Sequence, residues 1–121
     1  MKVHLRSFPK FVIVVWIISI GTVSYLSLIP QVEFPFYFRW SDKLYHFLAY
    51  FWLSVLPFFG FTSAKKALAW SLLMILLGIG LEFAQGFVPG RLFSIWDMIA
   101  NSLGASAGIF CGMSIKTSDV S

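Results

Sequence analysis

The sequence predicts an all-α membrane protein: a single domain of four transmembrane helices packed as an up-and-down antiparallel bundle. The composition is the first reason, since 59% of the 121 residues are hydrophobic and 12% are charged, whereas a soluble domain carries about 25% charged residues. The second reason is that the apolar residues form four stretches. Each is long enough to cross a hydrocarbon core about 30 Å thick at about 1.5 Å per residue. Short connections between the later stretches favour antiparallel neighbours.

The predicted spans cover approximately residues 11–29, 44–61, 67–87 and 93–115. A basic segment with Lys2, Arg6 and Lys10 precedes the first span, so that span could instead be a signal peptide. Its apolar stretch is longer than the usual signal-peptide core of about 7 to 15 residues and ends without a small-residue cleavage site, which favours a retained helix. Pro57 inside the second span removes a backbone donor and predicts a kink near the end of that helix.

The distribution of Lys and Arg predicts the orientation, because these residues concentrate on the cytoplasmic side of a membrane. The side that carries both termini holds Lys2, Arg6, Lys10, Lys65, Lys66 and Lys116, and the opposite side holds Arg39, Lys43 and Arg91. We therefore expect both termini in the cytoplasm and the first and third loops outside. The formal net charge of +4 comes from scattered residues rather than from a basic run, so nucleic acid is not an expected partner.

Polar and ionisable side chains lie at or inside the ends of the predicted spans that face outward. An ionisable group in hydrocarbon costs roughly 2.5 to 3.5 kcal/mol unless it faces the bundle interior and finds a partner. Within each span the members of this set are three or four residues apart, so they share one helix face. The rise per residue brings the faces of three helices to one layer. The predicted ligand-binding residues are Asp42, Lys43, His46, Glu82, Gln85, Arg91, Asp97 and Asn101.

Some of these residues also have structural explanations that leave no functional role. Asp42 stands at a helix start, where the helix dipole favours a carboxylate. Ser94 and Asp97 fit the S-x-x-D capping-box pattern, in which Asp97 would cap the fourth span. Lys43 could extend along the helix to reach the lipid headgroups.

Glu82 and His46 are harder to explain structurally. Glu82 lies well inside a helix where no cap is needed, and its simplest partner is Arg91, in an ion pair that closes the third loop. Such a pair need not stabilise the fold, because desolvation can exceed the Coulomb gain. His46 has the side chain whose charge changes near neutral pH, and a neighbouring carboxylate would hold its tautomer.

Gly104 and Gly108 form a G-x-x-x-G pair, which lets helices approach closely within the bundle or at a dimer seam. Internal packing is favoured because the same stripe continues from Asp97 and Asn101, which need buried partners. Cys111 is the single cysteine, and its apolar surroundings predict an inert thiol. The chain has no spacing typical of a metal site, so neither a metal nor another cofactor is expected.

Three functional classes fit this set of residues. The first is a binding protein for membrane lipids or a lipid-linked envelope precursor, with Lys43, Arg91 and the start of the fourth span holding a phosphate. The second is a membrane-embedded enzyme, with His46 as general base and Glu82 or Asp97 as acid. The third is a structural subunit, which allows a homodimer or a larger membrane complex. Lipid or glycopeptide-like amphiphile binding is the preferred interpretation.

The motif D-K-x-x-H at residues 42–46, followed by E-x-x-Q-x5-R-x5-D-x3-N-x-x-G-x3-G at residues 82–108, resembles the VanZ-like family of small bacterial membrane proteins. The resemblance implies a multi-pass protein of the bacterial inner membrane with a role in the cell envelope. The family is named for a protein associated with teicoplanin resistance, so a link to antibiotic resistance is one implication. The matching positions are Asp42, Lys43, His46, Glu82, Gln85, Arg91, Asp97, Asn101, Gly104 and Gly108.

Overall fold

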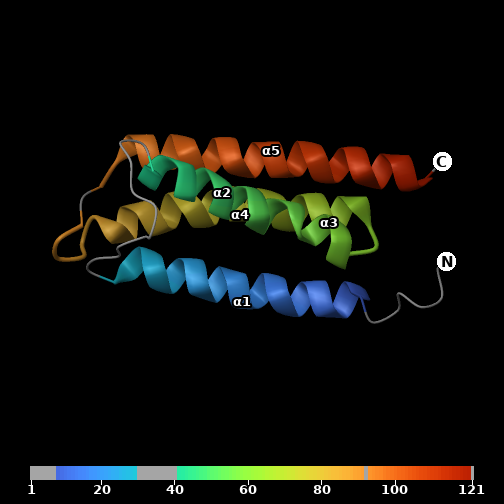
Figure 1. Cartoon of the computed structure of the whole chain (residues 1–121), viewed down its shortest axis with the longest axis horizontal. Helices are drawn as coiled ribbons and strands as arrows, with labels where there is room; N and C mark the ends of the chain where they lie inside the picture. The colour runs from blue at the N-terminus through green and yellow to red at the C-terminus, as the bar shows by residue number, and fades with distance from the viewer. Residues whose placement is uncertain (1–7, 30–40, 92, 121) are drawn as a thin grey trace.

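The computed structural model describes residues 8–29, 41–91 and 93–120, and Figure 1 shows how their helices pack. In chain order the helices are α1 (Phe8–Leu28), α2 (Ser41–Val55), α3 (Pro57–Gly60), α4 (Ala64–Gln85) and α5 (Ile95–Val120). The described residues contain no strand, which confirms the all-α class for this part of the chain. Lys2, Arg6 and Arg39, which entered the orientation argument, lie outside the described residues.

Three helices are long and apolar enough to cross a membrane, over Pro9–Leu28 in α1, Ala64–Gln85 in α4 and Ile95–Lys116 in α5. They mark the chain as a membrane protein. The prediction of a fourth span at residues 44–61 is corrected, because this segment divides into the 15-residue α2 and the four-residue α3. Fifteen helical residues rise about 23 Å, which is less than the roughly 30 Å of a hydrocarbon core, so α2 alone does not cross it. Together with α3, the segment nevertheless runs from the end of the bundle where α1 finishes toward the end where α4 begins (Figure 1).

Pro57 is the physical reason for that division. A proline has no backbone N–H, so the helical hydrogen bond to the carbonyl of Leu53 cannot form. The indole Nε1 of Trp16 in α1 donates to that carbonyl instead, at 2.8 Å. The hydroxyl of Ser71 in α4 donates to the next carbonyl, that of Ser54, at 2.6 Å. Backbone groups inside a membrane need internal partners of this kind, so α1 and α4 stabilise the break.

Glycines on α5 bring that helix into backbone contact with α2. A side chain at Gly104 would overlap the carbonyl group of Phe47, and one at Gly108 would come within 2.6 Å of the carbonyl oxygen of Phe51. Small residues permit such close approach of two helices. The G-x-x-x-G pair therefore packs α5 against α2 inside the chain.

The two ends of the bundle differ in chemistry. At one end α2 and α5 begin and α1 and α4 finish, and the predicted site residues lie there; we call it the polar end (Figure 1). Toward the opposite end, the ring centroid of Trp16 lies 5.9 Å from that of Phe61 and 5.6 Å from that of Trp70. Trp16 is 4% exposed. We call this the aromatic end.

Candidate functional site

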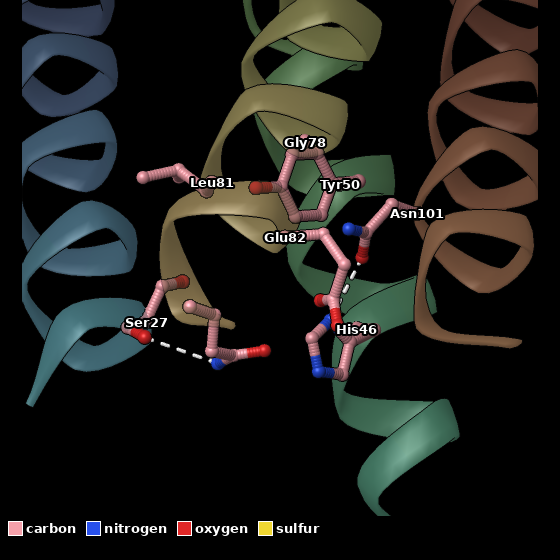
Figure 2. A pocket seen from close by; sticks show the side chains of 8 residues that line it. Ser27, His46, Tyr50, Gly78, Leu81, Glu82 and Asn101 are labelled. Carbon is pink, nitrogen blue, oxygen red and sulfur yellow. Dashed lines mark hydrogen bonds between the residues drawn. The ribbon is translucent and has the colours of Figure 1, made fainter. Parts of the chain in front are cut away.

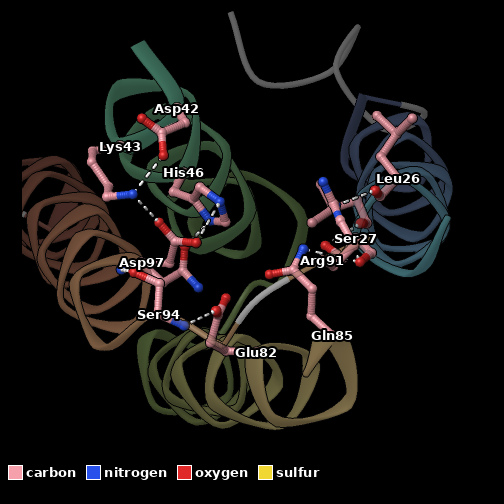
Figure 3. Close-up of polar contacts among 12 residues, drawn as sticks. Leu26, Ser27, Asp42, Lys43, His46, Glu82, Gln85, Arg91, Ser94 and Asp97 are labelled. Atoms are coloured by element: carbon pink, nitrogen blue, oxygen red, sulfur yellow. Dashed lines mark hydrogen bonds and ion pairs between the residues drawn. The ribbon is translucent and has the colours of Figure 1, made fainter. Parts of the chain in front are cut away.

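The predicted ligand-binding residues lie at the polar end and form two groups. The first surrounds Asp97 and draws on α2, α4 and α5, whereas the second faces the last turn of α1 (Figure 3). We call the first the Asp97 group; its members are Asp42, Lys43, His46, Glu82, Asp97 and Asn101. We call the second, which consists of Gln85 and Arg91, the α1 clasp.

Asp97 connects α5 to α2 through both of its carboxylate oxygens. Lys43 Nζ lies 2.8 Å from Oδ1 of Asp97, and His46 Nε2 lies 3.6 Å from Oδ2. Lys43 also forms an ion pair with Asp42, its neighbour in the first turn of α2. Asp97 itself is 8% exposed. The lysine is therefore held between two carboxylates, one nearly buried and one exposed.

The ring of His46 is held from both sides. Its Nδ1 lies 2.8 Å from the amide oxygen of Asn101, and Asn101 is 3% exposed. With that oxygen facing the ring, Nδ1 is the donor and Nε2 faces Asp97. The ring is therefore fixed between an amide and a carboxylate from successive turns of α5.

The predicted capping box is half formed. The hydroxyl of Ser94 accepts a hydrogen bond from the backbone N–H of Asp97 at 3.3 Å, as an N-cap serine should. In a complete box the Asp97 carboxylate would accept from the N–H of Ser94. Glu82 of α4 takes that position, because its Oε1 accepts from Ser94 N at 2.7 Å. This substitution leaves the Asp97 carboxylate available to the side chains of α2.

The predicted ion pair between Glu82 and Arg91 is wrong. Arg91 Nη2 donates to the backbone carbonyl of Leu26 at 2.9 Å and to that of Ser27 at 3.2 Å. Gly90, which precedes it, has a φ of 82°, a conformation that glycine adopts without strain. The chain turns there, and the guanidinium meets α1 rather than the carboxylate at the end of α4.

The α1 clasp satisfies backbone groups that a helix leaves open. The last carbonyls of a helix have no donor within it, and residue 30, the usual donor to Leu26, is a proline. Arg91 takes that place, and Gln85 Nε2 donates to the carbonyl of Ser27 at 3.0 Å. Our sequence reasoning missed these two carbonyls as partners, although the proline four residues after Leu26 was a signal for one of them.

A narrow pocket lies between α1, α2, α4 and α5, beside the Asp97 group (Figure 2). Gly78 lets its walls come together, because a side chain there would lie 3.0 Å from the ring of Tyr50 and 3.2 Å from Asn101. The pocket does not admit a molecule the size of water in this conformation. Its lining residues are Ser27, His46, Tyr50, Gly78, Leu81, Glu82, Gln85 and Asn101.

The electrostatics of the Asp97 group are dominated by carboxylates, with three of them to one lysine. Burial alone would raise the pKa of Asp42, but the hydrogen bond to Lys43 and its charge outweigh burial and hold that pKa below its ordinary value. Burial would lower the pKa of Lys43, yet hydrogen bonds to Asp42 and Asp97 raise it above its ordinary value. Across the described ranges, no three metal-ligating side chains come together in a way that could hold a metal ion.

Comparison with known proteins agrees with the motif. Residues 3–116 match the VanZ/LLP1 family. The chain is also similar to the uncharacterized protein C11E3.10 of Schizosaccharomyces pombe, with 30% identity over 103 residues, or 83% of this chain and 61% of that protein. It thus spans less than two thirds of that relative's length. No solved structure matches the chain. Because the family match extends over nearly the whole chain and includes the residues that converge at the polar end, the chain belongs to the VanZ/LLP1 family.

Proposed function

We propose that the chain binds the polar headgroup of an envelope lipid, a lipid-linked precursor or a similar amphiphile at the polar end, while its helices contact the apolar tail. In this proposal it is a multi-pass protein of the cell membrane, with both termini in the cytoplasm and the polar end outside. In the part of the chain that the structure describes, the cations toward the aromatic end are Lys10, Lys65, Lys66 and Lys116, and those at the polar end are Lys43 and Arg91. The larger number of Lys and Arg toward the aromatic end supports a cytoplasmic position for that end.

The orientation can be tested by reporter fusions. A reporter after Ser121 and another after Ser63 should both read cytoplasmic, and one at Val32 should read external. If the fusion after Ser121 reads external, the polar end does not face outward as proposed. The site would then have to serve a ligand on the other side of the membrane.

The observation that carries the binding proposal is the burial of a charged cluster in an apolar bundle. Glu82 is 2% exposed, Asp97 8% and Asn101 3%. Ionisable residues inside membrane helices are costly and typically mark a functional site. Apolar side chains of similar volume would stabilise such a position as well or better. Glu82 of α4 and Asp97 and Asn101 of α5 nevertheless converge beside His46. This convergence of buried polar side chains supports a ligand site.

The contacts of the Asp97 group favour a headgroup that donates hydrogen bonds over one that carries a phosphate. The cations expected to hold a phosphate are already engaged, Lys43 by two carboxylates and Arg91 by carbonyls of α1. The N–H groups of Ser94 and Asp97 at the start of α5 are also satisfied. What remains is a surplus of carboxylate acceptors, which suits a primary ammonium group or several sugar hydroxyls.

Retention of defined amphiphiles tests this proposal. The protein would be placed in phosphatidylcholine nanodiscs with dodecylammonium, dodecyltrimethylammonium or dodecyl phosphate, and the retained amphiphile would be quantified by mass spectrometry. Dodecylammonium should be retained best, because it alone combines a positive charge with N–H donors. Asp97→Asn should weaken its retention about 10- to 100-fold, as expected for the loss of a hydrogen bond to a charged group worth about 1.5 to 3 kcal/mol.

Two controls accompany the measurement. Lys65→Ala changes an exposed charge toward the aromatic end and should leave retention unchanged. The trimethylammonium compound keeps the charge and the alkyl chain and removes the donors. Equal retention of all three amphiphiles would contradict a headgroup site. Preferential retention of dodecyl phosphate, lost in Arg91→Ala, would show that the site selects anions.

The geometry of His46 supports a second candidate function, general acid–base catalysis on a lipid-linked substrate. Its ring lies between the Asp97 carboxylate and the Asn101 amide, and a neighbouring carboxylate orients an imidazole. His46→Gln keeps hydrogen-bonding groups but cannot transfer a proton, so turnover should fall by about 10² to 10⁴ while amphiphile retention survives. Loss of retention in His46→Gln would instead assign the ring to binding.

A further inference from the structure

A ligand can enter the pocket beside the Asp97 group only if one of its walls moves. The pocket does not admit a molecule the size of water, and the side chains of Glu82 and Asn101 are almost fully buried. Four helices contribute to the lining, α1 through Ser27, α5 through Asn101, and α2 and α4 through two or more residues each. Which helix moves depends on how each is held.

The walls formed by α2, α4 and α5 are tightly joined. Gly104 of α5 leaves no space between its helix and the backbone of α2 at Phe47. Gly78 of α4 allows close contact with the Tyr50 ring of α2 and with Asn101 of α5. The ion pair between Lys43 and Asp97 adds to this packing, and His46 lies beside the same carboxylate. Separating α2 from α5 would break this close packing and the ion pair between Lys43 and Asp97 together.

The remaining wall, α1, is the least buried of the long helices. Within the most apolar part of each span, 11% of the residues of α1 are buried, compared with 28% in α4 and 33% in α5. Its side chains Ile17, Ile18 and Tyr25 are mostly exposed, as expected for a helix that faces lipid on most sides. Moving α1 therefore disrupts less packing than moving any other wall.

The middle and the aromatic-end half of α1 are nevertheless anchored. Trp16 is buried, and its indole donates to the carbonyl that Pro57 leaves open in α2. The rings of Phe61 and Trp70 pack against it. Slightly further along, Ser19 accepts a hydrogen bond from the indole of Trp52 at 3.0 Å. These contacts define a fixed point about which the rest of α1 could turn.

At the polar end α1 is held by the clasp. Gln85 and Arg91 donate three hydrogen bonds to the carbonyls of Leu26 and Ser27. The positive charge of Arg91 also interacts favourably with the negative end of the helix dipole. All three bonds end on backbone carbonyls of one helix terminus. Releasing that terminus requires these two side chains to change partners and the partly buried Ile20 and Val23 to leave their packing against the core.

We propose that α1 is a side gate of the pocket. When the α1 clasp opens, the polar-end half of α1 turns away about its anchor at Trp16, and a headgroup enters the pocket from the membrane. Gln85 and Arg91 then act as positioning residues for the gate rather than as ligands. The proposed function supplies the identity of what enters, whereas the motion is a property of the chain alone.

Distances between spin labels test the gate without any ligand. In a Cys111→Ser background, one pair of labels would replace Tyr25 and Ile99 at the polar end, and a control pair would replace Phe11 and Phe110 toward the aromatic end. All four side chains are exposed, at 66%, 41%, 65% and 74%. Double electron–electron resonance in nanodiscs should show one main distance for each pair in the parent protein.

Arg91→Gln and Gln85→Leu should each add a longer distance at the polar end, with its population raised severalfold over the parent, and leave the control pair unchanged. An unchanged polar-end distance in both variants would overturn the gate, as would equal lengthening at the two ends. If Arg91→Gln does not fold, Gln85→Leu decides, because it removes one donor from a side chain of similar size. A failure of amphiphile retention would contradict the proposed function and leave this result intact.

Discussion

Replacing Gly104 with alanine should separate α5 from α2 and loosen the Asp97 group. The new methyl group would overlap the carbonyl and Cα of Phe47, which are backbone atoms and cannot turn aside as a side chain can. Overpacking of this kind typically costs about 1 to 3 kcal/mol, and we expect the upper end. Alanine recovers up to about 1 kcal/mol through its helix propensity. The free energy of unfolding should therefore fall by about 2 kcal/mol.

Gly80→Ala is the matched control, since no atom lies within 4 Å of a side chain at that position of α4. It should gain up to about 1 kcal/mol from the same propensity difference. Denaturant unfolding in detergent, followed by tryptophan fluorescence, measures both variants. Gly104→Ala should also retain less dodecylammonium, because His46 and Lys43 on α2 would move away from Asn101 and Asp97. Equal stability of the two variants would refute the close contact of α5 with α2.

Other expectations concern single contacts. A double-mutant cycle on Glu82 and Arg91 should return additive losses of unfolding free energy within about 0.5 kcal/mol, because the two bind different partners; clear coupling would contradict the geometry. Trp16→Phe should lower the free energy of unfolding, measured by thermal unfolding, by about 1 to 3 kcal/mol, because a buried carbonyl loses its donor while ring packing remains. Unchanged stability in this variant would argue that Trp16 does not anchor α1. The stabilisation from the ion pairs of Lys43 with Asp42 and Asp97, measured as the difference between the parent and Lys43→Met, should have two pH limits. The lowered pKa of Asp42 makes its contribution present above about pH 3.9 and lost as the pH falls through the folded-state value. The raised pKa of Lys43 makes its contribution present below about pH 10.4 and lost as the pH rises through the folded-state value. A difference that stays constant into acid and alkali would argue against both.

The helical class and the place of the polar layer could be predicted because they depend on local properties of the chain. Apolar length predicts α1, α4 and α5, since each must satisfy its own backbone within the membrane. A spacing of three or four residues puts Asp97 and Asn101 on one face of α5 whatever surrounds it. The effect of Pro57 was predictable for the same reason, because a missing N–H is a property of the residue. The length of the second span could not be predicted, because it depends on whether neighbouring helices, here α1 and α4, stabilise the break at Pro57.

Which side chains meet was decided by the tertiary structure. Simple charge matching paired Glu82 with Arg91, yet Glu82 accepts from Ser94 and Arg91 donates to a carbonyl 65 positions earlier. Such partners depend on the rotation and depth of one helix relative to another, which hydrophobic periodicity does not specify. Some of these partners are backbone carbonyls. The sequence does not show which carbonyls lack a hydrogen-bond donor, except where a proline such as Pro30 removes one. The sequence by itself therefore determined the three long helices and the layer in which polar groups gather. Only the packing of those helices divided that layer into a carboxylate cluster and a clasp on α1.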